Sequence, residues 1–285
     1  MSGFVLDHVG IATSNLDEGA AAFRRLGFAL TNRSVHTGRA TGNHCAMLPE
    51  GYLEIIGMAD PSVPSTFHDM LARYEGVHIV AFGCENADEA HDAIAGRQPG
   101  VAPPELLERD AEYIDPQDPS GAVQRRRAAF RNLYADGEVF PEARFLVIEH
   151  LTREVLWQPH LLEHPNGARA LLEVAICTPD VATTAARLGA VLAVEPQAQG
   201  SGIIALDLDR GRIYLLEPDS VPRWAKGVEP PRVPSVVGFG VGVADLARTK
   251  AVLSERDVTF RDHPYPAIWV PPGEARGAVV SFIQI

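Results

Sequence analysis

The order of expected strands and helices repeats along the chain, and this repetition limits the fold more than any other feature. Residues 4–57 read as a buried strand, a helix that begins after Asn15, and three further strands. The same order recurs over residues 76–150, 170–217 and 235–285. Four successive βαβββ modules predict an α+β protein.

An alignment of the four modules without gaps at their first strands brings polar residues to matching positions. His78 matches His8, and an acidic or amide residue falls near the start of each helix. Because histidine recurs at the same place in the first two modules, we predict that these two histidines share one site. The matching positions of the first strand are His8, His78, Glu173 and Gly238, and those near the helix start are Asn15, Glu85, Asp180 and Asp245.

The modules divide the chain into two halves, residues 1–150 and residues 151–285. Residues 98–120, in the second module, are rich in proline and aspartate and are predicted to form a loop. Residues 151–169 join the halves, and we expect this crossover to pack Trp157 against a sheet.

The first module carries a recognisable pattern. Its opening, LDHVGIAT followed by a helix that ends in LGF, and its later strand, GYLEII, resemble the vicinal oxygen chelate superfamily and most closely its glyoxalase-like branch. That superfamily includes glyoxalase I, extradiol dioxygenases and metal-free resistance proteins. The resemblance implies that modules pair into halves, and that each pair forms a U-shaped cleft around a metal. Each module would then offer one ligand from its first strand and one from its last.

The resemblance selects four residues as metal ligands. His8 and Glu54 belong to the first module, and His78 and Glu149 belong to the second. Two imidazoles with carboxylates suit one divalent ion of zinc, nickel, cobalt, manganese or iron. Glu149 alternates with His150 along one strand, so a register that differs by one residue places His150 at the metal instead. The third and fourth modules lack this set of ligands.

Three residues are candidates for acid–base catalysis in the cleft. Glu149 is expected to move a proton beside a metal-bound substrate, with His150 as the alternative from the same strand. His44, in the third strand of the first module, is expected either to face the cleft or to lie near the surface. His36 stands beside Thr37-Gly38 in a predicted turn and is not included among the candidates.

The predicted function is that of a metal-dependent, glyoxalase-like lyase or isomerase. Such an enzyme would act on a small oxygenated substrate through an enediolate or enolate, which the metal stabilises. One alternative is a non-haem iron dioxygenase of the extradiol type, because two histidines and a carboxylate also suit that metal. The other alternative is a metal-free protein that binds a small molecule, as resistance proteins do.

Composition limits the partners and the compartment. The formal net charge is −12, which disfavours binding to nucleic acid. No apolar run approaches the length of a membrane span, and the first residues do not read as a secretory signal. The three cysteines form no CxxC pair and suit a reducing compartment. We therefore predict a cytoplasmic monomer or homodimer whose partner is a small-molecule substrate.

Overall fold

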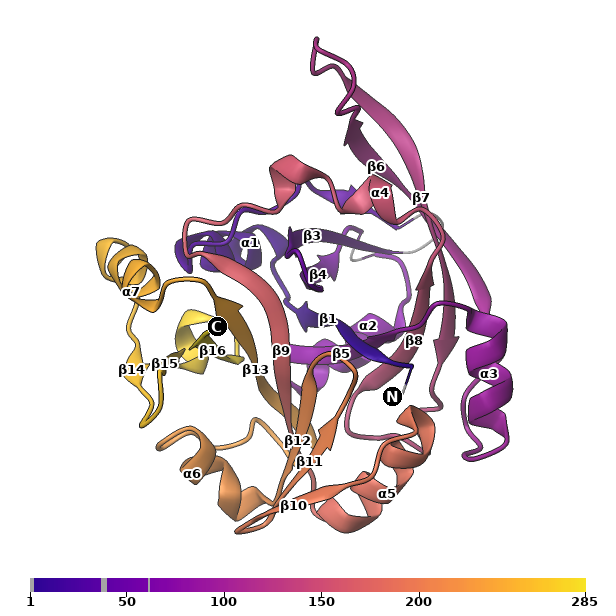
Figure 1. Cartoon of the computed structure of the whole chain (residues 1–285), viewed down its shortest axis with the longest axis vertical. Helices are drawn as coiled ribbons and strands as arrows, with labels where there is room; N and C mark the ends of the chain where they lie inside the picture. Colours follow the sequence, from indigo (N-terminus) through magenta and orange to yellow (C-terminus); the bar gives the residue numbers. More distant parts are fainter. Residues whose placement is uncertain (1–2, 37–39, 61) are drawn as a thin grey trace.

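The computed structural model describes residues 3–36, 40–60 and 62–285. It confirms the predicted α+β fold built from paired modules (Figure 1). Within these residues the strands form two eight-stranded sheets, and each sheet contains two modules.

The first sheet joins the first two modules through an antiparallel pair of strands at its centre, β1 (Val5–Ala12) and β5 (Gly76–Gly83). Each of these strands also pairs in parallel with the last strand of its own module. The other strands are β2 (Ser34–Val35), β3 (Thr41–Met47), β4 (Tyr52–Met58), β6 (Glu105–Ile114), β7 (Val123–Tyr134) and β8 (Arg144–His150). The order across the sheet is β2-β3-β4-β1-β5-β8-β7-β6.

The second sheet repeats this plan with the last two modules. Its central antiparallel pair is β9 (Ala168–Cys177) with β13 (Ser235–Val243). The other strands are β10 (Gln197–Gly200), β11 (Ile203–Asp207), β12 (Arg212–Leu216), β14 (Arg261–Asp262), β15 (Ala267–Val270) and β16 (Val279–Gln284). The order is β10-β11-β12-β9-β13-β16-β15-β14, so each half has the same internal symmetry.

One helix follows the first strand of every module, and its first residue is set by a side-chain cap. Asn15, Asp180 and Asp245 cap their helices as predicted, but Asn86 caps the helix of the second module in place of Glu85. No helix in the described residues is long and apolar enough to span a membrane. The helices are α1 (Leu16–Arg25), α2 (Thr66–Arg73), α3 (Ala87–Ala95), α4 (Arg153–Leu156), α5 (Val181–Leu192), α6 (Val221–Trp224) and α7 (Leu246–Glu255), with 3-10 turns η1 (Pro159–Leu161), η2 (Pro218–Ser220) and η3 (Pro272–Glu274).

The largest apolar core extends through both halves. It includes Phe82 from the first sheet and Phe239 from the second, both fully buried. Phe28 of the first half stacks on Phe282 of the second, with ring centroids 5.9 Å apart. Each such side chain contributes about 1.5–3 kcal/mol on burial, so the halves stabilise one another through this shared core.

The crossover between the halves is fixed to the first half by two aromatic side chains. Trp157 packs on the first sheet as expected, and its Nε1 donates a hydrogen bond to the carbonyl of Leu48 at 3.0 Å. His164 accepts from the amide of Ala29 at 3.0 Å and donates to the carbonyl of Met47 at 2.8 Å. Burial lowers the pKa of His164, in keeping with a neutral ring that has one donor and one acceptor.

The loop predicted over residues 98–120 is wrong for its middle part, which forms strand β6. This strand and β7 make a long hairpin that projects from the body of the protein (Figure 1). Its outer part pairs Asp110 with Arg127 and Glu112 with Arg125 across the strands. One face of β6 carries Glu108, Asp110 and Glu112 and is exposed, whereas Leu107, Arg109, Ala111 and Tyr113 on the other face are buried or half-buried. Arg109 interrupts the apolar residues of that inner face, so the alternation that marks a half-buried strand is hard to recognise in the sequence.

Candidate functional site

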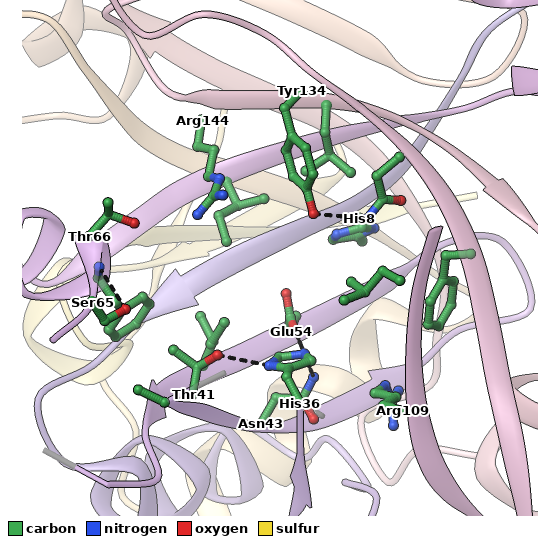
Figure 2. A pocket seen from close by; sticks show the side chains of 18 of the residues that line it. His8, His36, Thr41, Asn43, Glu54, Ser65, Thr66, Arg109, Tyr134 and Arg144 are labelled. Carbon is green, nitrogen blue, oxygen red and sulfur yellow. Dashed lines mark hydrogen bonds and ion pairs between the residues drawn. The ribbon is translucent and has the colours of Figure 1, made fainter. Parts of the chain in front are cut away.

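A cavity of about 320 Å³ lies inside the first half, on the inner face of its sheet. Side chains from the strands of both modules line it (Figure 2). The polar residues that line it include His8, His36, Asn43, Glu54, Arg109, Asn132 and Arg144, and the apolar ones include Phe67, Ile79, Phe130, Leu146 and Ile148. Both modules therefore contribute polar and apolar side chains to the cavity.

His8 and its neighbour Asp7 form a hydrogen-bonded pair at this cavity. A register shift in the pairing of β1 with β5 leaves Asp7 without a partner residue, so consecutive side chains can meet. His8 Nδ1 donates to Asp7 Oδ1 at 2.7 Å, and the imidazole stacks on Tyr52 at 4.3 Å. The Asp7 carboxylate fixes the proton on Nδ1, and no described residue bonds Nε2, which is left as the basic nitrogen.

The Asp7 carboxylate is buried and serves a second histidine. Its oxygens lie 3.1 and 3.2 Å from Nε2 of His150. Burial alone would raise the pKa of Asp7, but His150 and His8 together hold it well below its usual value. Asp7 is therefore an ionised group that orients two imidazoles, of which only His8 lines the cavity.

Glu54 is held in a separate network on the same wall. Its Oε1 accepts from Asn43 Nδ2 at 2.6 Å and lies 3.5 Å from His36 Nε2. His36 Nδ1 in turn lies 2.9 Å from the Thr41 hydroxyl (Figure 2). Burial opposes ionisation of Glu54, but the contacts with His36, His8 and Asn43 lower its pKa to about 2. Glu54 is thus ionised and poorly suited to act as a base near neutral pH.

His36 was expected in a turn, and its turn partners Thr37-Gly38 lie outside the described residues. The imidazole itself is buried and forms part of the cavity wall. No periodicity marks this position, since His36 follows a strand of only two residues.

Arg109 brings a buried positive charge to the cavity. Its side chain is 7% exposed, and its NH1 group donates to the hydroxyl of Ser34 at 2.9 Å. Within the described residues no carboxylate lies within ion-pair distance of its guanidinium. A buried arginine that lacks a carboxylate partner is suited to bind an anionic ligand. The sequence prediction missed Arg109 because it falls in the stretch that was assigned to a loop.

His78 does not reach this cavity. It is the extra residue at a register shift, between Val77 and Ile79, and its ring packs on Tyr74 at 3.9 Å. His78 Nε2 donates to the carbonyl of Tyr74 at 2.8 Å, and burial lowers the pKa of the ring. Its side chain lines a different cavity, beside Pro234.

The strand register identifies the residues that take the expected ligand positions in the second module. His8 faces Ala81 and Gly10 faces Ile79, so the two-fold axis between β1 and β5 superposes Ile79 on His8. By the same symmetry Leu146, which pairs with Ala81, takes the place of Glu54, which pairs with Gly10. Both positions therefore carry aliphatic side chains that offer no donor atom.

The other predicted residues are distributed around the site. Glu149 points to the outer face, where its Oε2 accepts from the amide of Ala87 at the start of α3 at 3.0 Å. His150 lies on the inner face, in the alternative register, but behind Asp7 and against Trp157. His44 also points away from the cavity, and its Nδ1 donates to the carbonyl of Thr31 at 2.9 Å.

These positions do not fit the metal site that the family pattern implies. Of the four expected ligands, His8 and Glu54 share the cavity, whereas His78 and Glu149 lie outside it. In the described part of the chain, no group of three or more His, Cys, Asp or Glu side chains is arranged to hold a metal ion. We therefore derive no reaction step through a metal.

Elemental analysis tests this disagreement directly. We expect protein purified without added metal or a histidine tag to contain far less than one equivalent of zinc, nickel, cobalt, manganese or iron. Excess ion should leave Tm unchanged, whereas a site filled at 100 times its Kd would add about 2.7 kcal/mol and raise Tm by roughly 5 °C or more. One equivalent of metal that is lost in His8→Ala would show that His8 is a ligand after all.

The second half differs from the first at the corresponding positions. Glu173 takes the place of His8, as the sequence alignment predicted, Gly238 takes the place of Ile79, and Tyr214 takes the place of Glu54. Glu173 is buried, and its Oε1 has no hydrogen-bond partner among the described residues. Burial raises the pKa of Glu173 to about 7, with Arg212 opposing the shift. This half is otherwise filled by apolar side chains that include Trp269.

Comparisons with known proteins agree with this architecture. A family model described as a glyoxalase-like domain matches residues 6–192. A hypothetical protein from Staphylococcus aureus is similar in structure, with a TM-score of 0.69 and 11% identity, over 99% of this chain and 100% of that one. A mutant of 4-hydroxymandelate synthase from Streptomyces coelicolor has a TM-score of 0.63 and 15% identity, and the match covers 100% of this chain and 93% of that one. A fusion of a xylose isomerase-like TIM barrel with 4-hydroxyphenylpyruvate dioxygenase has a TM-score of 0.58 and 14% identity, and the match covers 98% of this chain and 49% of that one. Among curated protein sequences no match was found.

Proposed function

Because the chain belongs to the family of glyoxalase-like domains, we propose that it is a lyase or isomerase that moves a proton on a small oxygenated carboxylate. The reaction passes through an enolate in the cavity of the first half. One observation carries this proposal: the Asp7–His8 pair leaves a basic nitrogen without a protein partner at a cavity that also holds the buried cation Arg109.

His8 is the proposed general base. Its Nε2 takes a proton from the carbon next to a substrate carbonyl, and Asp7 stabilises the imidazolium that forms. Stacking on Tyr52 restrains the ring, so the nitrogen keeps its direction during the transfer. The imidazolium then returns the proton either to another carbon or oxygen of the substrate, which completes an isomerisation, or to a leaving oxygen whose bond to carbon breaks as the enolate collapses, which completes an elimination.

In this proposal, positively charged side chains at the cavity stabilise the enolate, which is the role that a metal has in the family pattern. Arg109 and Arg144 both line the cavity, and together they can bind the substrate carboxylate and stabilise the enolate oxygen. The buried oxygens of Asn43 and Asn132, which have no partner among the described residues, can accept hydrogen bonds from a substrate hydroxyl. The aliphatic wall of Ile79, Leu146 and Ile148 excludes water from the enolate.

A binding protein without catalytic activity is the second candidate. It is favoured by the aliphatic residues at two of the four expected ligand positions, Ile79 and Leu146, which suit a pocket better than a reaction centre. The two candidates differ in whether a bound ligand loses a carbon-bound proton.

Exchange of that proton for deuterium tests the proposal without knowledge of the product. The protein is incubated in D₂O with 2-oxobutanoate and other small 2-oxo acids, and the loss of the C3 proton signal is followed by NMR. We expect catalysed exchange that falls about a thousandfold in His8→Gln and about a hundredfold in Arg109→Met. The matched control is His78→Gln, which changes a buried histidine outside the cavity and should keep wild-type exchange.

The outcomes separate the candidates. Binding of a 2-oxo acid without exchange supports the binding protein. Exchange that is equal in His8→Gln and the wild type contradicts the assignment of His8 as base. Loss of exchange in His78→Gln would restore the four-ligand site that the family pattern implies.

A further inference from the structure

A second cavity, of about 510 Å³, lies beside the first. It is bounded by residues 30–35, by strand β6 and by the crossover near Leu161. Strands β2 and β6 are the two edges of the first sheet, and in the described residues neither has a strand partner on its outer side. The cavity therefore occupies the seam where the curved sheet of the first half comes closest to closing on itself.

Side chains cross this seam. Arg109 of β6 donates to the Ser34 hydroxyl of β2 at 2.9 Å, and Asn32 donates to Glu112 at 2.7 Å. Arg109 lines both cavities, so its side chain is part of the partition between them. A rotamer change of one arginine is fast and costs little compared with the movement of a strand, so this partition can open to a ligand.

The second cavity has an apolar floor and a rim of balanced charge. Ala111, Val155, Leu156 and Leu161 belong to, or pack on, the apolar cluster beneath the first cavity. Apart from Arg109, the rim carries two arginines and two carboxylates, so it offers no net charge for a second anionic group. The rim also carries uncharged polar side chains, among them Thr31, Asn32 and Gln158, so it is the floor of the cavity that offers an apolar surface to an aliphatic chain.

We propose that the two cavities bind one ligand, with its oxygenated carboxylate head in the first and an aliphatic tail in the second. Arg109 marks the point where the head ends and the tail begins. The substrate class is then a medium-chain 2-oxo acid or a close relative, in place of a three- or four-carbon acid. This inference rests on the proposed function for the chemistry of the head group only.

A series of 2-oxo acids tests the channel by isothermal titration. Affinity for the wild type should rise about threefold for each methylene from 2-oxobutanoate to 2-oxooctanoate, because each added group is buried in the second cavity. Leu161→Trp places a bulkier side chain over the apolar floor of that cavity and should bind 2-oxobutanoate as the wild type does, while the gain for the longer acid is lost. The matched control is Leu162→Trp, which changes the next residue, does not line the cavity and should keep the full gain.

The results distinguish failure of the channel from failure of the proposed function. If 2-oxobutanoate binds and longer acids bind no more tightly, or if Leu161→Trp keeps the gain, the channel is overturned and the proposed function stands. If the gain is present and is lost in Leu161→Trp, but no proton exchange occurs, the channel stands and the catalytic proposal falls. If neither acid binds, both are overturned.

Discussion

Replacement of Asp7 by alanine is expected to lower the free energy of unfolding by about 3–5 kcal/mol and to abolish proton exchange. The carboxylate is buried and accepts from both His8 and His150, so its removal leaves two buried imidazoles without their common acceptor. It also frees the His8 ring to change tautomer, which removes the basic nitrogen from the cavity. Urea unfolding followed by circular dichroism measures the first effect, and the deuterium assay measures the second.

Asp7→Asn separates the structural role of this residue from its catalytic role. The amide keeps the volume of the side chain, but one of its two polar atoms is a donor and cannot accept from an imidazole N–H. We expect a smaller loss of stability than in Asp7→Ala, but a fall in exchange of about a thousandfold. Wild-type exchange in a destabilised Asp7→Asn protein would mean that Asp7 supports the fold alone.

Glu173→Gln is expected to stabilise the protein at alkaline pH and to have little effect at acidic pH. Burial raises the pKa of Glu173 to about 7 from 4.5, so the folded state binds this proton more tightly than the unfolded state does. The free energy of unfolding of the wild type therefore falls as the pH rises from about 4.5 to about 7, and the penalty is complete above that range. A shift of this size corresponds to about 3 kcal/mol, and glutamine removes it because an amide stays neutral.

The measurement is urea unfolding of the wild type and the variant at pH 5 and pH 8. Arg212 and Tyr265 interact electrostatically with Glu173. Glu142→Gln is unsuitable as a control because Glu142 forms an ion pair with Arg187. A better control is Glu195→Gln, which changes an exposed carboxyl of the same half. Equal stabilisation of Glu173→Gln at both pH values would contradict the assigned pKa.

The repeated modules, and hence the fold, were predictable from sequence because each module has a strand, a capped helix and a strand pattern of its own. Pairing of modules into halves followed from the resemblance to a known superfamily. The weaker step was the alignment of modules one and two. The alignment that matches His8 with His78 separates the two modules by 70 residues. A separation of 71 residues superposes Asn15-Leu16-Asp17-Glu18 on Asn86-Ala87-Asp88-Glu89, and both asparagines cap their helices.

This difference of one residue in the alignment determined which residues of the second module were predicted to lie in the site. In a strand, a shift of one position moves a side chain to the opposite face, so His78 was placed in the cavity and Ile79 was overlooked. The paired identity of His8 and His78 was a coincidence of the shorter alignment. The repeated Asn-x-Asp-Glu motif was the signal that corrects it.

The remaining residues of the site have no local signature. Arg109 lies on a hairpin whose charges resemble those of a solvated loop, but it is on the inner face of β6 and contacts Ser34 of β2. Asp7 reaches His8 because of a strand irregularity that no periodicity reveals. Both depend on contacts between segments distant in the chain, which a pattern of neighbouring residues does not encode.

The core that both halves share ties the strand that carries Asn43 to a half with no residue in the cavity. Phe282 of the second half stacks on Phe28, whose ring meets the edge of His164, and His164 holds the carbonyl of Met47 at the end of β3. We therefore expect a substitution at Phe282 to affect the position of β3 and of Asn43 in the cavity wall. The second half therefore helps to hold the shape of the cavity through packing, although none of its described residues lines that cavity.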